Sequence, residues 1–78
     1  MQNFPSLKSK QFLKILMREP LNYSIIRIVG SHKTLSSVTF PTISYSFHQN
    51  KEISGHVVKR ILMKNIGLTQ QQAWEVVK

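Results

Sequence analysis

The chain lacks cysteine altogether, which excludes disulfide bonds and thiolate metal sites. Acidic residues are almost as scarce, because the only carboxylate side chains are those of Glu19, Glu52 and Glu75. They fall in separate segments rather than in a closely spaced pair, which argues against a glycosidase-type acid pair and a two-metal nuclease site. The three glycines lie far apart, so a glycine-rich phosphate loop and a dinucleotide-binding fingerprint are also missing.

Long apolar runs are absent as well. No run approaches the roughly 20 residues that span a bilayer, and the start Met1-Gln-Asn-Phe-Pro lacks the charged and then apolar plan of a signal peptide. The sequence therefore predicts a cytoplasmic protein.

Positive charge is what the chain has in excess, with 11 Lys and Arg against 3 acidic residues and a net charge of +8. Such an excess favours polyanionic partners such as nucleic acids, in a salt-dependent way. A basic ribosomal or structural protein, or a surface neutralised by an acidic protein partner, fits the same composition. Composition alone does not separate these classes from a nuclease.

A chain of 78 residues has room for one hydrophobic core, which predicts a single domain over residues 1–78. Apolar residues at helical spacing predict a basic amphipathic helix from Ser6 to Arg18, capped by Ser6 or Ser9 and stopped by Pro20. The β-branched segment 23–29 predicts a strand that enters a tight turn at Gly30.

Two further strands and two further helices are expected. A second strand would run from His32 to about Phe40, and the alternation of apolar residues with serines predicts a third over 43–47. After the polar stretch 48–51, Ser54 caps a second helix that Gly67 ends. Thr69 and Gln72 form a capping-box pattern for a short last helix. The order predicts an α+β fold with a three-stranded antiparallel sheet covered on one face.

Three histidines complete the inventory of groups suited to catalysis: His32, His48 and His56. Their spacing does not match a zinc site. The remaining chemistry is metal-free cleavage of RNA, in which the ribose 2′-hydroxyl supplies the nucleophile. Histidine suits the proton transfers near neutral pH, and Lys or Arg stabilises the charge that develops on the phosphate.

The segment Gly30-Ser-His-Lys33, which follows a strand and a basic N-terminal helix, resembles the hallmark of the HicA family of mRNA-interferase toxins. The resemblance covers nearly the whole chain and continues in order through three segments: His48-Gln-Asn-Lys-Glu-Ile53, Val57-Val-Lys-Arg-Ile-Leu62 and Gly67-Leu-Thr69. The chain departs from the family pattern at Ser46, where a proline is common, and in the interval before Gly55, which is one residue shorter.

The resemblance implies a HicA-like toxin domain with a fold similar to that of double-stranded RNA-binding domains. It makes the protein an endoribonuclease that cleaves mRNA and blocks translation, with no cofactor. His32 becomes the catalytic acid or base, and Gly30 and Ser31 the turn that presents it. The expected partner is a HicB-type antitoxin that covers the site and holds the toxin silent in a heteromeric complex.

Other interpretations of these residues stay open. His32 could instead be a turn histidine bonded to backbone or water, and His48, the second catalytic candidate, a strand-end residue bonded to the backbone. Lys33 is a candidate phosphate clamp, and Lys59 and Arg60 are candidates for contacting the RNA backbone, with a solvated basic face as the alternative. The rival functions are a non-catalytic RNA-binding module of the same fold and a toxin relic that only binds its partner.

Two residues outside the candidate site carry weaker expectations. Arg27 lies among apolar neighbours of the first strand, so it either points outward or pairs with an acidic partner. Trp74 is expected to cover the core or to contact a partner, rather than to stack on a nucleic-acid base.

Overall fold

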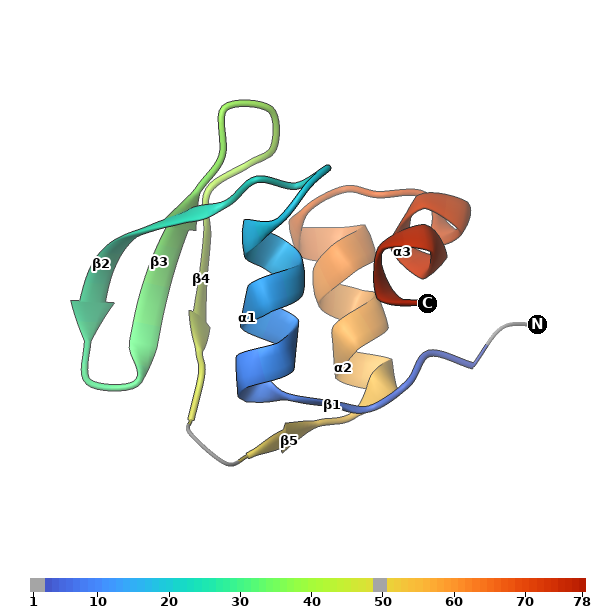
Figure 1. The fold of residues 1–78 in the computed structure, drawn as a ribbon, viewed down its shortest axis with the longest axis horizontal. Helices are drawn as coiled ribbons and strands as arrows, with labels where there is room; N and C mark the ends of the chain where they lie inside the picture. The colour runs from blue at the N-terminus through green and yellow to red at the C-terminus, as the bar shows by residue number, and fades with distance from the viewer. Residues whose placement is uncertain (1–2, 49–50) are drawn as a thin grey trace.

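The computed structural model describes residues 3–48 and 51–78. Along the chain these residues form β1 (Leu7–Lys8), α1 (Ser9–Met17), β2 (Ser24–Val29), β3 (His32–Ser36), β4 (Ile43–Ser46), β5 (Glu52–Ile53), α2 (Gly55–Arg60), the π-helical turn η1 (Ile61–Asn65) and α3 (Gln70–Val77). Because η1 starts directly after Arg60, it continues the coil labelled α2 in Figure 1. Gln49 and Asn50, part of the polar stretch expected after the third strand, lie outside the described residues.

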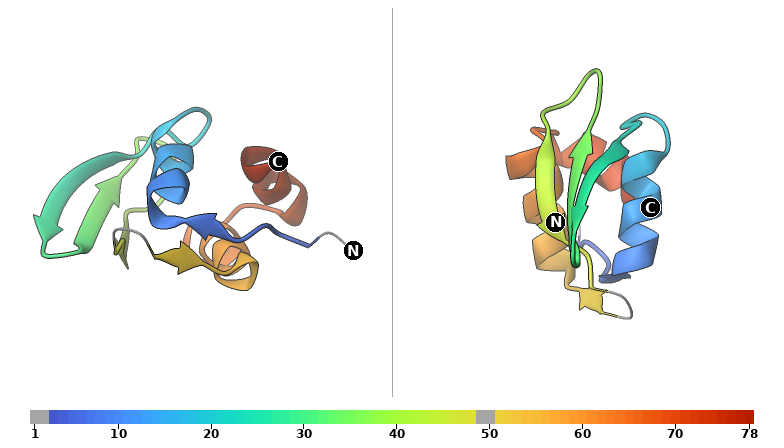
Figure 2. Two further views of the ribbon diagram at one scale, coloured as in Figure 1. Left: turned by 60° about the horizontal axis from the view of Figure 1, so that its bottom comes forward. Right: turned by 90° about the vertical axis from the view of Figure 1, so that its left-hand side faces the viewer.

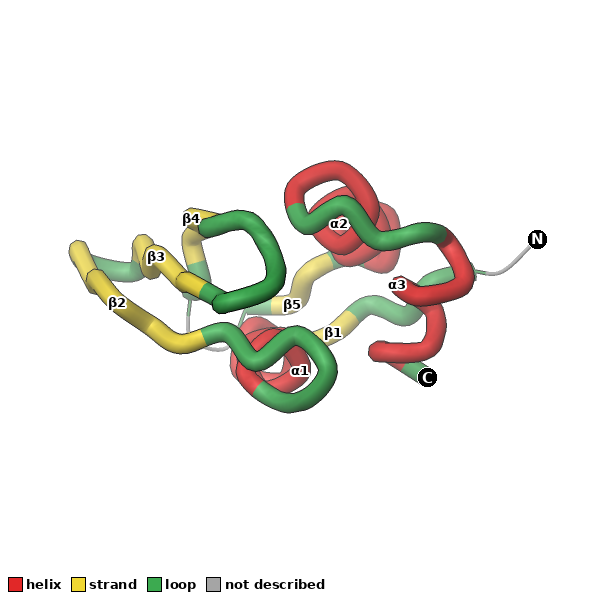
Figure 3. The backbone as a smooth tube through the Cα atoms, turned by 90° about the horizontal axis from the view of Figure 1, so that it is seen from above, coloured by secondary structure: helices red, strands yellow, loops and turns green. Residues whose placement is uncertain are grey.

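The fold is α+β, as the sequence predicts. Strands β2, β3 and β4 form an antiparallel three-stranded sheet in that order, and β1 pairs with β5 in a separate two-stranded ribbon. Figure 3 shows α1 and α2 on the same side of the larger sheet. The order of helix, three strands, helix and short helix is therefore confirmed. The β1–β5 ribbon was not predicted, because two-residue strands leave no periodic pattern.

The register of the sheet decides which side chains face the helices. Leu35 lies opposite Ile43, and both are buried against the helical layer. Because side chains alternate between the faces of a strand, the residues one position away point to the other side, away from the helices. We call that side the outer sheet face and define it by these residues: Arg27, Val29, His32, Thr34, Ser44 and Ser46.

The predicted length of the second strand is wrong. β3 ends at Ser36 rather than at Phe40, and Val38 is fully exposed in the following bend. The hydroxyl of Ser37 donates to the carbonyl oxygen of Leu21 at 2.8 Å and accepts from the backbone N–H of Thr39 at 3.3 Å. These local bonds compete with the strand ladder and turn the chain. The alternation in β4 is confirmed, because Ile43 and Phe47 are buried while Ser44 is exposed.

The caps of the helices were predicted with mixed success. Lys8, not a serine, is the N-cap of α1, and its backbone N–H donates to the side chain of Gln11 at 3.1 Å. Ser9 is instead buried inside the first turn, where its hydroxyl donates to the carbonyl oxygen of Lys51 at 3.2 Å. Ser54 does cap α2, accepting from the backbone N–H of Val57 at 3.3 Å.

The end of the second helix and the start of the last are confirmed. Gly67 adopts a left-handed backbone with φ of 93° just after the π turn. The hydroxyl of Thr69 accepts from the backbone N–H of Gln72 at 3.1 Å, and the Gln72 side chain accepts from the backbone N–H of Thr69 at 2.9 Å. This reciprocal pair is the predicted capping box.

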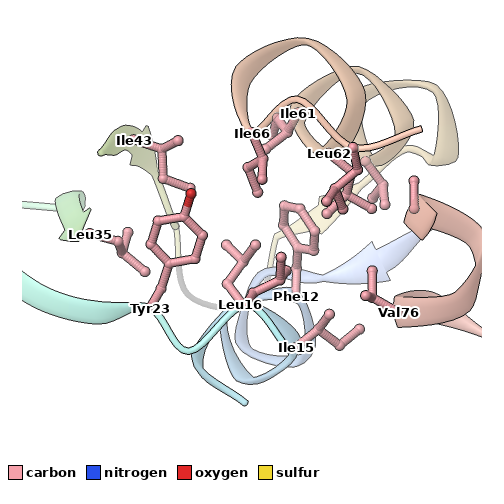
Figure 4. Packing of buried hydrophobic residues seen from close by; sticks show 14 of the residues in the cluster. Phe12, Ile15, Leu16, Tyr23, Leu35, Ile43, Ile61, Leu62, Ile66 and Val76 are labelled. Atoms are coloured by element: carbon pink, nitrogen blue, oxygen red, sulfur yellow. The ribbon is translucent and has the colours of Figure 1, made fainter. Parts of the chain in front are cut away.

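One hydrophobic core lies between the sheet and the helices. Figure 4 shows Phe12 and Leu16 of α1 facing Leu62 and Ile66, with Tyr23 beside them. The buried apolar residues are Phe12, Ile15, Leu16, Leu21, Tyr23, Leu35, Ile43, Phe47, Ile53, Val58, Ile61, Leu62, Ile66, Leu68, Ala73 and Val76. Trp74 is half-buried and contacts Phe4 edge to face, with ring centroids 5.7 Å apart, so it covers the edge of the core.

Tyr23 is a polar group within this core, and its removal gives a prediction on stability. Its side chain is 2% exposed, and its hydroxyl donates to the carbonyl oxygen of Pro41 at 2.6 Å. Tyr23→Phe should lower the free energy of unfolding by about 1 kcal/mol, the usual net worth of one such bond. Urea unfolding near neutral pH measures the difference.

The same substitution should change the response to alkaline pH. Burial raises the pKa of the Tyr23 hydroxyl above its ordinary value. Above about pH 10 the unfolded chain ionises this group while the folded chain keeps it neutral, so the folded state loses stability as pH rises through that range. Tyr23→Phe removes this loss, and its deficit relative to wild type should shrink at high pH. An unchanged deficit at both pH values would contradict the argument.

Candidate functional site

The turn between β2 and β3 has the geometry that the sequence predicts. Gly30 and Ser31 form a two-residue loop, with Val29 paired to His32 on the opposite strand. Gly30 has a positive φ of 61°, whereas Ser31 does not. A positive φ at the first loop residue alone is the pattern of a type II′ turn, which requires glycine there. The turn therefore makes His32 the first residue of β3.

His32 is exposed on the outer sheet face, between Val29 on β2 and Ser46 on β4. Figure 2 shows the β2–β3 hairpin projecting beyond the helices, which leaves this face open to large ligands. The backbone N–H of Phe47 donates to the carbonyl oxygen of Ser31 at 2.8 Å, and the hydroxyls of Ser31 and Ser46 are 3.4 Å apart. These bonds fix β4 against the turn that carries the histidine.

Arg27 shares the outer sheet face with His32. It is exposed and pairs with Thr34, which in turn lies opposite Ser44. Arg27 and His32 are thus diagonal neighbours across two strands, a relation that separates Cα atoms by about 7–8 Å and lets a long side chain reach its neighbour. Of the two readings of Arg27 from the sequence, the outward one is confirmed. Its place beside His32 was missed.

Three hydroxyl groups and the apolar Val29 make up the rest of this face. The Thr34 and Ser44 hydroxyls lie 3.4 Å apart, and Ser46 lies next along β4. Hydroxyls and guanidinium groups are frequent donors to phosphate oxygens in nucleic-acid complexes. The outer sheet face therefore carries a proton-transfer group, a cation and several donors, and none of its residues is acidic.

Lys33 does not share a face with His32. Neighbouring residues of a strand point in opposite directions, and Lys33 projects toward the helical side, with its Nζ 6.0 Å from the centroid of the Phe47 ring. There it lines a groove of about 220 Å³ with Ser9, Lys10, Leu13 and Phe47. The geometry thus separates Lys33 from the histidine that it was expected to assist.

Lys59 and Arg60 form a separate basic surface on the helical layer. They line a groove of about 320 Å³ together with His56, Met63 and Lys64, and the Lys59 Nζ lies 5.8 Å from the centroid of the Phe4 ring. His32 is not part of this groove. Helix α2 therefore presents Lys59 and Arg60 on one surface, and strand β3 presents His32 on another.

His48 lies just after β4 and is exposed. It lines a groove of about 430 Å³ that also includes Ser46, the residue directly opposite His32. Ser46 therefore connects the outer sheet face to the groove of His48. The two candidate histidines therefore belong to neighbouring strands, with His32 at the start of β3 and His48 two residues beyond the end of β4.

Two kinds of feature are absent from residues 3–48 and 51–78. No three His, Cys, Asp or Glu side chains in that part of the chain gather in a group that could hold a metal ion. No helix there is long and apolar enough to cross a membrane.

Comparison with known proteins adds no assignment to this geometry. Protein-family models, curated proteins and solved structures were all compared with the chain, and none of them matched.

Proposed function

We propose that this chain is the toxin of a type II toxin–antitoxin pair, a HicA-like endoribonuclease that cleaves mRNA with His32 as the general acid or base. The observation that carries the proposal is the placement of His32. A tight glycine turn presents it on an open sheet face beside Arg27 and a row of hydroxyls. In the cytoplasm, where mRNA is translated, such a protein would block translation by destroying its template.

The chemistry needs no metal ion and no cofactor. The ribose 2′-oxygen attacks the adjacent phosphorus, its proton passes to a base, and the 5′-oxygen of the next nucleotide leaves with a proton from an acid. The products are a 2′,3′-cyclic phosphate and a 5′-hydroxyl. His32 serves one of the two proton transfers, and the Arg27 guanidinium stabilises the charge on the phosphate oxygens. His48, just beyond the end of the neighbouring strand β4, is the candidate for the second transfer.

The arrangement of the elements supports the likeness to a double-stranded RNA-binding domain. Helix α1, the three strands β2 to β4 and helix α2 follow one another in that order, with both helices on one side of the sheet. The resemblance to HicA toxins rests on the Gly30-Ser-His-Lys33 turn within that arrangement. The proposed domain spans residues 1–78.

A protein partner is part of the proposal. Three large apolar side chains of β2 are more than half exposed, namely Ile26, Ile28 and Val29. The far edge of β2 pairs with no other strand among the described residues. Exposed apolar side chains on an unpaired edge strand favour a protein partner over solvent, and the net charge of +8 favours an acidic surface on that partner. We assign this partner as a HicB-type antitoxin, and Val29 would bring it against His32.

Arg27 and Lys33 give a matched test of the geometry, because both are basic residues of the same hairpin. Arg27→Ala should lower the cleavage rate constant about tenfold to hundredfold, since it removes a cation from the face of His32. Lys33→Ala should change that rate constant by less than about threefold, since alternation places it on the other face. Single-turnover cleavage of one RNA measures both. Equal losses would contradict the assignment of the outer sheet face as the reaction surface.

A non-catalytic RNA-binding module is the second candidate function. The basic groove of His56, Lys59, Arg60 and Lys64 favours it, because four cationic or titratable side chains gather there without His32. Such a surface suits shape-based recognition of duplex RNA through its phosphates. This module would bind RNA and leave it intact.

Cleavage of paired oligonucleotides separates the two functions. The wild-type protein should cut a single-stranded RNA in the presence of EDTA and leave a 2′,3′-cyclic phosphate. It should not cut the same sequence with a 2′-deoxyribose at each cleavage position, because that substrate lacks the nucleophile. Binding of both oligonucleotides without cleavage of either would favour the RNA-binding module.

A further inference from the structure

A groove lies beside the edge strand β4, and of its lining residues the proposed proton transfers involve only His48. The groove measures about 430 Å³, within the range of about 300–1,000 Å³ that small-ligand sites occupy. Its described lining comes from α1, β4, β5 and the start of α2, elements that Figure 1 shows converging below β4. The lining residues are Ser9, Tyr45, Ser46, His48, Lys51, Glu52, Ile53, Ser54 and Val57.

The groove lies along β4, the strand that pairs with the start of β3 at His32. Ser46 lines it and is also the ladder partner of His32 on the outer sheet face. Directly opposed residues of an antiparallel pair hold their Cβ atoms about 4.5–5.5 Å apart. An RNA strand with a phosphate at His32 therefore has its neighbouring nucleotide within reach of the groove.

We propose that this groove binds one unpaired nucleotide of the RNA, the nucleotide that adjoins the cleaved phosphate. The inference rests on the proposed function and adds a binding site to it. Tyr45, Ile53 and Val57 provide an apolar lining of a kind that accommodates a base. The exposed side chains of Lys51 and His48 flank that lining, and Lys51 carries the positive charge that attracts a flanking phosphate.

Glu52 adds selectivity among bases. One of its carboxylate oxygens accepts from the Ser6 hydroxyl at 3.1 Å, and an ionised carboxylate has further acceptor positions. A carboxylate accepts readily from the exocyclic amino group of cytosine, as in other complexes with nucleic acids. Uracil has no such amino group, so the groove prefers cytosine to uracil.

Binding of a non-cleavable RNA tests the groove without any need for catalysis. The probe is a short single-stranded RNA with 2′-O-methyl riboses, titrated against wild type, Lys51→Ala and Lys14→Ala. Lys14 is an exposed lysine of α1 that does not line the groove, so it controls for net charge alone. Lys51→Ala should weaken binding about fivefold and reduce the slope of log affinity against log salt by about 0.7. Lys14→Ala should change the affinity and the salt slope by less than half of the change that Lys51→Ala causes. Equal effects of the two variants would overturn the proposal.

A second comparison tests base selectivity. Wild type should bind a cytosine-containing 2′-O-methyl RNA more tightly than the same RNA with uracil, and Glu52→Gln should reduce that preference. A preference unchanged by Glu52→Gln would overturn the role of Glu52. Because these probes are never cut, failure of the groove and failure of the nuclease are distinguishable. If the wild type cleaves RNA but Lys51→Ala binds the non-cleavable probe as tightly as the wild type does, only the proposed groove site is refuted. If the variants bind the probe as expected but the wild type does not cleave RNA, only the proposed nuclease activity is refuted.

Discussion

Replacing His32 with alanine should lower the rate constant of RNA cleavage by about 10²–10⁴-fold, the usual contribution of a positioned general acid or base. The affinity for a non-cleavable RNA should stay within about twofold of wild type, because Arg27 and the hydroxyls of the outer sheet face remain. The fold should also persist. His32 is exposed at the start of a strand, and substitutions at such sites usually change stability by less than about 0.5 kcal/mol.

His56→Ala is the matched control, because His56 is also exposed but lies on the helical layer. It should retain the wild-type rate constant. Single-turnover cleavage gives the rate constants, binding of the 2′-O-methyl RNA gives the affinities, and circular dichroism reports the fold. A His32→Ala protein that is folded, binds RNA and cleaves at the wild-type rate would make His32 a structural turn residue. Equal losses in the two variants would show that the effect is not specific to the outer sheet face.

Gly55→Ala should cost about 3 kcal/mol of unfolding free energy, at the upper end of the usual range for overpacking. A Cβ atom at Gly55 would overlap the backbone carbonyl of Phe4, where the N-terminal segment crosses the start of α2. The backbone fixes the position of a Cβ atom, and the Phe4 carbonyl is itself part of the backbone, so neither can give way by a change of rotamer. The N-terminal segment must move instead, and the edge-to-face contact between Phe4 and Trp74 would be lost.

Tryptophan fluorescence detects this movement, because Trp74 is the only tryptophan in the chain. Gly55→Ala should change the emission of the folded protein as well as its urea midpoint. Gly67→Ala provides the control. Its Cβ would meet no atom within 4 Å, so it should cost only the left-handed backbone penalty of about 1–2 kcal/mol and leave the emission unchanged. A Gly55→Ala protein as stable as wild type would contradict the close crossing.

Local signals predicted the β2–β3 turn and the caps of α2 and α3, but not the cap of α1. Gly30 lies in the turn of a hairpin, and Ser54 and Thr69 cap helices. In β4 apolar residues alternate with serines, and this alternation identifies the buried face of the strand. Each of these features depends on residues only a few positions apart, so the sequence pattern contains the cause. The end of β3 was missed because hydrogen bonds from the Ser37 side chain took precedence over strand propensity.

The relation between His32 and its neighbours was also contained in the sequence. A two-residue loop at Gly30 and Ser31 pairs Val29 with His32, and alternation then places Arg27 on the same face and Lys33 on the other. Because Lys33 is adjacent to His32 in the sequence, Lys33 rather than Arg27 was expected to assist the histidine. Register is thus a better guide than sequence proximity for the cationic groups of a site on a strand.

The groove and the requirement for Gly55 could not have been predicted in this way. The groove needs Ser9 of α1 and Lys51, which are 42 positions apart and joined by a partly buried hydrogen bond. Gly55 is required because Phe4 crosses it from the far end of the chain. Contacts over such separations arise from tertiary packing and leave no periodic mark on either segment.

The role of His32 in metal-independent RNA cleavage is tested most directly by comparing wild type with His32→Ala. The growth of cells that express each protein under tight induction is one measurement. The integrity of one RNA incubated with each purified protein in the presence of EDTA is the other. We expect that only the wild type arrests growth and that only the wild type cuts the RNA despite the chelator. If both proteins arrest growth and cut equally, or if neither does so while both bind RNA, His32 is structural and the assignment as a metal-independent ribonuclease toxin is wrong.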